Sequence, residues 1–135
     1  MKIIKWVILT LILFIVVCEF ILRYAFGFCD ALLYRQSDKY EYIAQPNQDR
    51  HRFGAYIHYN SFSQRNGEPD STKLRVLGLG DSVLFGGTWM DQDSLASTLF
   101  SDESGTQMLN ISSGSWGPDN CAAYLKEKGT FGASA

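Results

Sequence analysis

The 135-residue sequence has no excess of positive charge and few cysteines. Its 12 Lys and Arg are outnumbered by 14 Asp and Glu, so the net charge is −2 and nucleic acid is not attracted in general. Three cysteines, an odd number, do not make the disulfide framework of a small secreted domain. We therefore expect neither a nucleic-acid partner nor a disulfide-stapled scaffold.

The motifs that bind common nucleotide cofactors are also missing. A dinucleotide fingerprint needs three glycines, but Gly78-Leu79-Gly80 is followed by Val83 where the third glycine belongs. A phosphate-binding P-loop needs a Gly-Lys-Ser/Thr sequence, and no lysine follows Gly80 at that spacing. The sequence therefore predicts no cofactor.

What the sequence does have is a concentration of apolar residues at its N-terminus, where 22 of the first 28 residues are apolar. Roughly 20 helical residues cross a bilayer core of about 30 Å, and Ile3–Leu22 supplies that length. Lys2 and Lys5 favour keeping this end in the cytoplasm. We predict a transmembrane signal-anchor in residues 1–28, with the rest of the chain on the periplasmic side.

Two alternatives to an uncleaved anchor are less well supported by the residues. A cleaved signal peptide needs small residues before the cut, and Tyr24–Phe28 offers a poor site. A lipoprotein needs a small residue before the modified cysteine, but Val17 precedes Cys18 and Phe28 precedes Cys29. The anchor remains the preferred interpretation, and cleavage stays open.

Residues 29–72 predict an extracytoplasmic spacer with one or two short strands. Tyr40–Ile43 is a β-like run, and Arg52–Tyr59 alternates roughly between apolar and polar side chains. The aromatics here suit packing against a following domain better than a glycan-binding surface. His51 and His58 have no further ligand at metal-binding spacing, so we expect no metal site.

Residues 73–135 predict the order strand, helix, strand, helix. Leu74–Leu79 is an apolar strand, and acids before Leu95 suit the start of a helix. Met108–Ile111 forms a second strand, and Asn120–Lys128 a second helix that ends at a glycine. This alternation is typical of a parallel α/β sheet.

The ends of these two strands carry the candidate chemistry. The first stops at Gly80-Asp81-Ser82, which places Ser82 at the tip of a strand-to-turn junction. The second runs into a loop of small residues from Ser112 to Gly117. Ligands bind at the carboxyl ends of strands in such sheets. A serine on one loop and free backbone N–H groups on the other are the parts that acyl transfer requires.

This combination resembles the SGNH, or GDSL, hydrolase family, especially its membrane-anchored bacterial envelope members. The matching blocks are Leu74–Gly87 around the nucleophile and Leu109–Asn120 around the oxyanion donors. Tyr59–Arg65 looks like a segment found upstream in anchored members, so the resemblance covers roughly residues 55–135. It implies a flavodoxin-like three-layer sandwich and hydrolysis of an ester.

The resemblance also implies roles for individual residues. Ser82 is the nucleophile, and its own N–H is one oxyanion donor. The second donor in the family is usually a glycine N–H five residues after the asparagine; Ser115 holds that place, so Gly114 and Ser115 are named jointly. Gly80 permits the tight turn, and Asp81 braces it by hydrogen bonding. The implied substrates are acyl or acetyl esters of envelope glycans or lipids.

The chain departs from the family in two blocks. The Gly-x-Asn-Asp block and the C-terminal Asp-x-x-His block are absent, and the two histidines precede Ser82. A doubly wound domain usually needs well over 100 residues, more than residues 73–135 supply. We therefore expect the N-terminal portion of a hydrolase, truncated and inactive as this chain.

The alternative is a non-catalytic, membrane-anchored envelope module that binds glycan or a partner protein. The reading frame beyond Ala135 discriminates the two, since a downstream Asp-x-x-His supports the enzyme. The thiols also stay open at this point: Cys29 and Cys121 could form a disulfide outside the cytoplasm or remain single.

Overall fold

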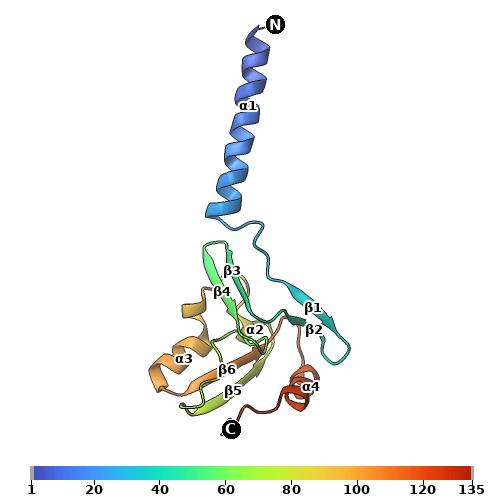
Figure 1. The fold of residues 1–135 in the computed structure, drawn as a ribbon, viewed down its shortest axis with the longest axis vertical. Coiled ribbons are helices and arrows are strands. Elements are labelled where there is room, and N and C mark those ends of the chain that lie inside the picture. The colour runs from blue at the N-terminus through green and yellow to red at the C-terminus, as the bar shows by residue number, and fades with distance from the viewer. Residues whose placement is uncertain (1, 135) are drawn as a thin grey trace.

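The chain begins with a long apolar helix that stands away from the rest of the molecule. The computed structural model describes residues 2–134 and shows α1 (Lys2–Phe20) continuing into a π-helical turn, Ile21–Ala25 (Figure 1). Lys2–Ala25 is long and apolar enough to cross a membrane, although a signal sequence at the N-terminus would have the same length and composition. Near the end of this helical segment, Arg23 Nε donates to Glu19 Oε1 at 3.0 Å.

Two antiparallel hairpins follow the helix, where one or two strands were predicted. Their strands are β1 (Tyr34–Ser37), β2 (Glu41–Ala44), β3 (Gln48–Arg52) and β4 (Ala55–Tyr59). The predicted strand Arg52–Tyr59 is wrong at its start, because Phe53 has a positive φ and turns the chain with Gly54. The spacer prediction missed β1 and β3, whose polar residues lack the alternation of a half-buried strand.

The remaining residues form the predicted two-stranded parallel sheet with helices around it. Its elements are β5 (Arg75–Gly80), α2 (Ser82–Phe85), the 3-10 turn η2 (Gln92–Ser94), α3 (Ala96–Ser104), β6 (Gln107–Ser112) and α4 (Pro118–Lys128). Both strands, the two longer helices and the parallel pairing are confirmed, whereas α2 was not predicted. Figure 1 shows α3 and α4 on opposite sides of this sheet. The fold is mixed helix and sheet.

The hairpins pack onto residues 75–128 through two buried apolar clusters, one on β6 and α4 and the other on α2. Tyr40 and Ile43 join residues of β6 and α4 in one cluster, which includes Trp116 and Tyr124. Leu32, Ala44, Ile57, Tyr59 and Phe85 form the other. The prediction that the aromatics of residues 29–72 pack against the following unit is therefore confirmed for Tyr40 and Tyr59.

Two details of the helices and thiols also emerge. Leu95 is fully buried just before α3, but Leu99 and Phe100 remain 47% and 39% exposed, so the apolar side chains of this helix are only partly covered. Cys29 is exposed and Cys121 is buried in α4, and both thiols are free.

Candidate functional site

The first loop of the site leaves the sheet at Gly80, which pairs with Ser112 across the two parallel strands. A Cβ on Gly80 would lie 2.9 Å from Leu84 Cβ, because α2 folds back over the end of β5. Glycine is thus required here for space. Asp81 caps α2, since its Oδ1 accepts the Val83 N–H at 2.9 Å. This is the bracing hydrogen bond that the sequence suggested.

Ser82 is the first residue of α2, and its side chain is exposed. Neither its hydroxyl nor its backbone N–H has a hydrogen-bond partner within residues 2–134. Its carbonyl accepts the N–H of Gly86, which ends the short helix with a φ of 74°. The chain therefore presents a free serine hydroxyl at the carboxyl end of a buried strand.

The second loop begins at Ser113, directly after β6, and makes a tight turn. The Trp116 N–H donates to the Ser113 carbonyl at 3.3 Å, and Ser115 has a φ of 60°. A turn with a positive φ at its third residue favours glycine there, so Ser115 occupies a glycine-like conformation. In the described chain, the N–H groups of Gly114 and Ser115 donate to no protein acceptor.

Tyr42, on strand β2, holds this second loop in place. Its hydroxyl donates to the Gly114 carbonyl, and its own carbonyl accepts the Trp116 indole N–H at 3.0 Å. Trp116 is buried and tilts against Tyr40 at a centroid distance of 5.8 Å. These contacts were not predicted, because 74 residues separate Tyr42 from Trp116.

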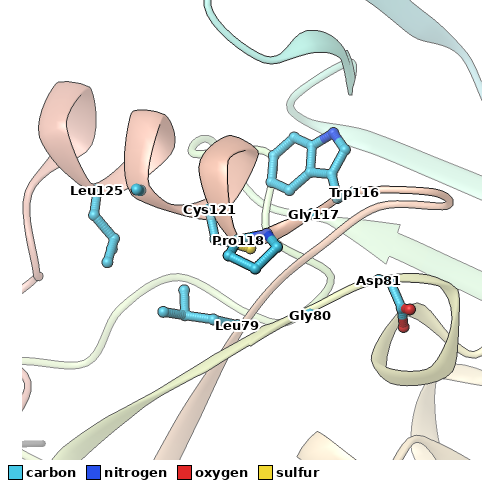
Figure 2. A pocket seen from close by; sticks show the side chains of 9 residues that line it. Leu79, Gly80, Asp81, Trp116, Gly117, Pro118, Cys121 and Leu125 are labelled. Atoms are coloured by element: carbon cyan, nitrogen blue, oxygen red, sulfur yellow. The ribbon is translucent and has the colours of Figure 1, made fainter.

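A cavity of about 450 Å³ lies between β5, the second loop and α4. Figure 2 shows Leu79 facing Pro118 and Leu125 across this space, with Asp81 at one end. Both loops border it, but Ser82, Gly114 and Ser115 lie outside its lining. Burial raises the pKa of the Cys121 thiol on its wall, which therefore stays protonated at neutral pH.

Arg65 fixes the chain that follows α2, although it reads as an ordinary surface residue in the sequence. It is fully buried, with Nη1 donating to the carbonyls of Phe85 and Gly87 and Nη2 to that of Met90 at 2.7 Å. Burial lowers the pKa of the guanidinium, but an arginine remains charged at neutral pH. A buried cation therefore organises the backbone just after the candidate nucleophile.

Asn110 links the sheet to the segment before it. Its N–H donates to Asn66 Oδ1 at 2.7 Å, and its Nδ2 donates to the Leu84 carbonyl and to Ser97 Oγ at 3.1 and 2.9 Å. Its carbonyl accepts the Arg65 N–H, so this segment lies along the outer edge of β6. This role of Asn110 was not predicted, because the groups that accept its hydrogen bonds lie 13 to 44 residues away in the sequence.

The two histidines lie on the β3–β4 hairpin. His58 Nδ1 is 2.8 Å from Asp49 Oδ1, and its backbone N–H donates to Gln92. Hydrogen bonds from Tyr56 and His58 hold the pKa of the Asp49 carboxyl below its usual value. Within residues 2–134 no cluster of three or more His, Cys, Asp or Glu side chains is arranged to hold a metal ion.

The two loops thus place a free serine hydroxyl and three unpaired backbone N–H groups at one edge of a parallel sheet. No protein-family model, curated protein or solved structure matches this chain. The arguments for function therefore come from the residues of this edge.

Proposed function

We propose that this chain carries the nucleophile and oxyanion loops of a serine ester hydrolase of the SGNH, or GDSL, type, anchored in the bacterial envelope. The observation that supports it is the pairing of Gly80 with Ser112, which brings the exposed Ser82 hydroxyl and the turn at Ser113–Trp116 to one sheet edge. The flavodoxin-like three-layer sandwich of that family is part of the proposal.

In this mechanism the Ser82 oxygen attacks the ester carbonyl as its proton passes to a general base, and the N–H groups of Ser82 and of Gly114 or Ser115 stabilise the oxyanion. The ester C–O bond then breaks, the alcohol leaves with that proton, and water releases the acid from the acyl-serine. Donors fixed before the reaction stabilise developing charge without reorganisation. Ser115 meets this requirement because Tyr42 and the Ser113–Trp116 hydrogen bond hold its turn. The substrate class is an acyl or acetyl ester of an envelope glycan or lipid.

A serine also needs a general base, since it is a weak nucleophile at its free pKa. His58 precedes Ser82 in the chain, an order that the family does not show, so we do not assign it that role although it bonds Asp49. We therefore expect residues 1–135 alone to show no esterase turnover, and the base to act from another segment of the natural gene product. The α1 helix is assigned to the membrane and residues 29–135 to the periplasmic side.

The experiment is hydrolysis of p-nitrophenyl acetate by the natural gene product, its Ser82→Ala variant and a Ser71→Ala control. Removing a serine nucleophile costs several orders of magnitude in rate, whereas Ser71 is exposed on a distant turn. We expect Ser82→Ala alone to abolish turnover. Absence of turnover in the natural gene product, or turnover that survives Ser82→Ala, contradicts the proposal and favours a non-catalytic binding module.

A further inference from the structure

An exposed aromatic stack lies beside the end of the apolar helix. Trp89 is 74% exposed, yet its ring stacks on Phe53 with centroids 5.1 Å apart and planes 12° apart. Phe28 meets the same Phe53 ring edge-on at 5.2 Å, and the Arg52 guanidinium lies 4.4 Å from its centroid. We name these four residues, Phe28, Arg52, Phe53 and Trp89, the interfacial cluster.

The cluster is assembled from three separate parts of the chain. Phe28 follows the helix, Arg52 and Phe53 form the end of the β3–β4 hairpin, and Trp89 lies on the loop between α2 and η2. That loop is rigid because Arg65 binds the carbonyls of Gly87 and Met90 on either side of Trp89. An ordered group of aromatic side chains that stays exposed on the protein surface marks a site where a partner outside the chain binds.

Hydrogen bonds hold the hairpin directly against the end of the helix. The Phe53 N–H donates to the Phe26 carbonyl at 2.7 Å, and Arg52 Nη1 donates to the Phe28 carbonyl at 3.2 Å. Gly27 lies so close that a Cβ there would be 1.8 Å from the His51 carbonyl oxygen. Figure 1 shows the β3–β4 hairpin pointing toward the end of α1.

A second set of contacts stiffens the same junction. Asp30 accepts the His51 N–H at 2.6 Å and pairs with Arg50 at 3.1 Å. The connection from the helix to the hairpin is therefore short and bonded at several points. The distance between the interfacial cluster and the end of the helix is fixed by these contacts.

The height of the cluster relative to a bilayer follows from the helix length. The 24 residues Lys2–Ala25 span about 36 Å at about 1.5 Å each, compared with an apolar core of about 30 Å. The end of the helix therefore reaches the headgroup region, and Phe28 follows it by three residues. Tryptophan and arginine favour this region because each combines an apolar body with a polar or charged group, and phenylalanine rings beside them add apolar surface that faces the acyl chains.

We infer that the interfacial cluster is a lipid contact, in which Phe28, Phe53 and Trp89 enter the headgroup region of the bilayer that α1 spans. The inference rests on the membrane assignment of α1 and not on the hydrolase assignment of Ser82. This lipid contact holds the β3–β4 hairpin and the Trp89 loop against the membrane surface. The two proposals can therefore fail separately.

The test uses tryptophan quenching in the full chain reconstituted into phosphatidylcholine–phosphatidylglycerol vesicles whose acyl chains are brominated near the headgroup. Trp6→Phe removes the indole within the helix and leaves Trp89 together with the buried Trp116. The matched control is Trp6→Phe/Trp89→Phe, which keeps an aromatic ring in the cluster. Resistance to alkaline extraction shows whether each variant is anchored.

We expect brominated lipid to quench the single variant strongly and the double variant hardly at all, so that the lost emission belongs to Trp89. Aqueous iodide should quench both variants equally little. The inference is overturned if the two variants are quenched by lipid to the same extent. It is also overturned if iodide quenches Trp89 from water, which would leave the stack free for a glycan or protein, or if the chain is extracted.

Discussion

The segment Asn60–Asn66 and the loops after β5 and β6 both contain many polar groups. Most of these groups are hydrogen-bonded in the segment, whereas several in the loops have no partner in the described chain. In the segment, the side chains of Asn60, Gln64, Arg65 and Asn66 are buried and hydrogen-bonded, and only Ser63 Oγ and Arg65 Nε are buried there without a partner within residues 2–134. In the loops, the Ser82 hydroxyl and several N–H groups are unpaired among the described residues. A buried polar group without a partner is costly, so the first arrangement specifies structure, whereas the second is affordable only next to water or a ligand.

Removing Arg65 should have the largest effect on this contrast. Arg65→Ala leaves three backbone carbonyls without a donor in a buried site, and we expect a loss of about 3 to 5 kcal/mol in the free energy of unfolding. Urea unfolding of the full chain in detergent micelles, followed by tryptophan fluorescence, measures it. Arg35→Ala, at an exposed position, is the control; a loss below about 1 kcal/mol for Arg65→Ala would show that the network matters little.

The clamp on the second loop predicts a smaller effect. Tyr42→Phe removes the hydroxyl that bonds the Gly114 carbonyl, and we expect a loss of about 1 kcal/mol together with faster amide exchange at Gly114 and Ser115. Tyr34→Phe is the matched control, because its ring packs edge-on against Tyr42 at 5.8 Å. Equal exchange in the two variants would mean that the turn holds itself.

Ser115→Gly should change stability in the opposite direction. The positive φ of Ser115 destabilises a residue with a side chain by about 1 kcal/mol, and glycine relieves this strain. Part of the stabilisation is lost because glycine has more conformational freedom in the unfolded chain. We therefore expect a net stabilisation of up to about 1 kcal/mol in the same urea assay. Ser71→Gly, at a turn without positive φ, should lose a few tenths; matching losses at both sites would refute the strain at Ser115.

The smallest effect concerns an exposed ion pair between the β1–β2 hairpin and α4. Lys39 and Lys128 bond Glu127 and lower the pKa of its carboxyl from 4.5 to about 2. A depressed folded pKa means that the stabilisation is present above pH 4.5 and is lost as the pH falls toward 2. In the urea assay, the free energy of unfolding of the wild type should be slightly larger than that of Glu127→Gln at neutral pH. The difference should vanish at acid pH. A pH-independent difference would exclude the ion pair as its cause.

The parallel unit was predictable because its signals are local. Apolar strands such as Leu74–Leu79, the glycines after the helices and Pro118 at a helix start all follow from residues near in sequence. Ser82 stands directly after one of these strands, whereas Gly114 and Ser115 were singled out only through the resemblance to the hydrolase family. Strands such as Gln48–Arg52 were missed because their residues are polar and only pairing with a neighbour makes them strands.

The supports of the site could not be predicted, because they depend on contacts between distant residues. Nothing near Arg65 indicates that it will be buried under the carbonyls of residues 85–90. Likewise, Tyr42 reaches the second loop only after the β1–β2 hairpin has folded onto α4. The sequence pattern of one strand does not indicate which loop the Tyr42 hydroxyl will contact.

The most direct test of the central claim is covalent labelling of the natural gene product by a fluorophosphonate ester, mapped by mass spectrometry. The Ser82 oxygen attacks phosphorus and fluoride leaves, which marks a serine activated for acyl transfer. We predict one adduct, on the peptide that contains Ser82, and none in Ser82→Ala, whose free energy of unfolding stays within about 0.5 kcal/mol of wild type. An adduct on another serine, or no adduct in the folded protein, would contradict the account.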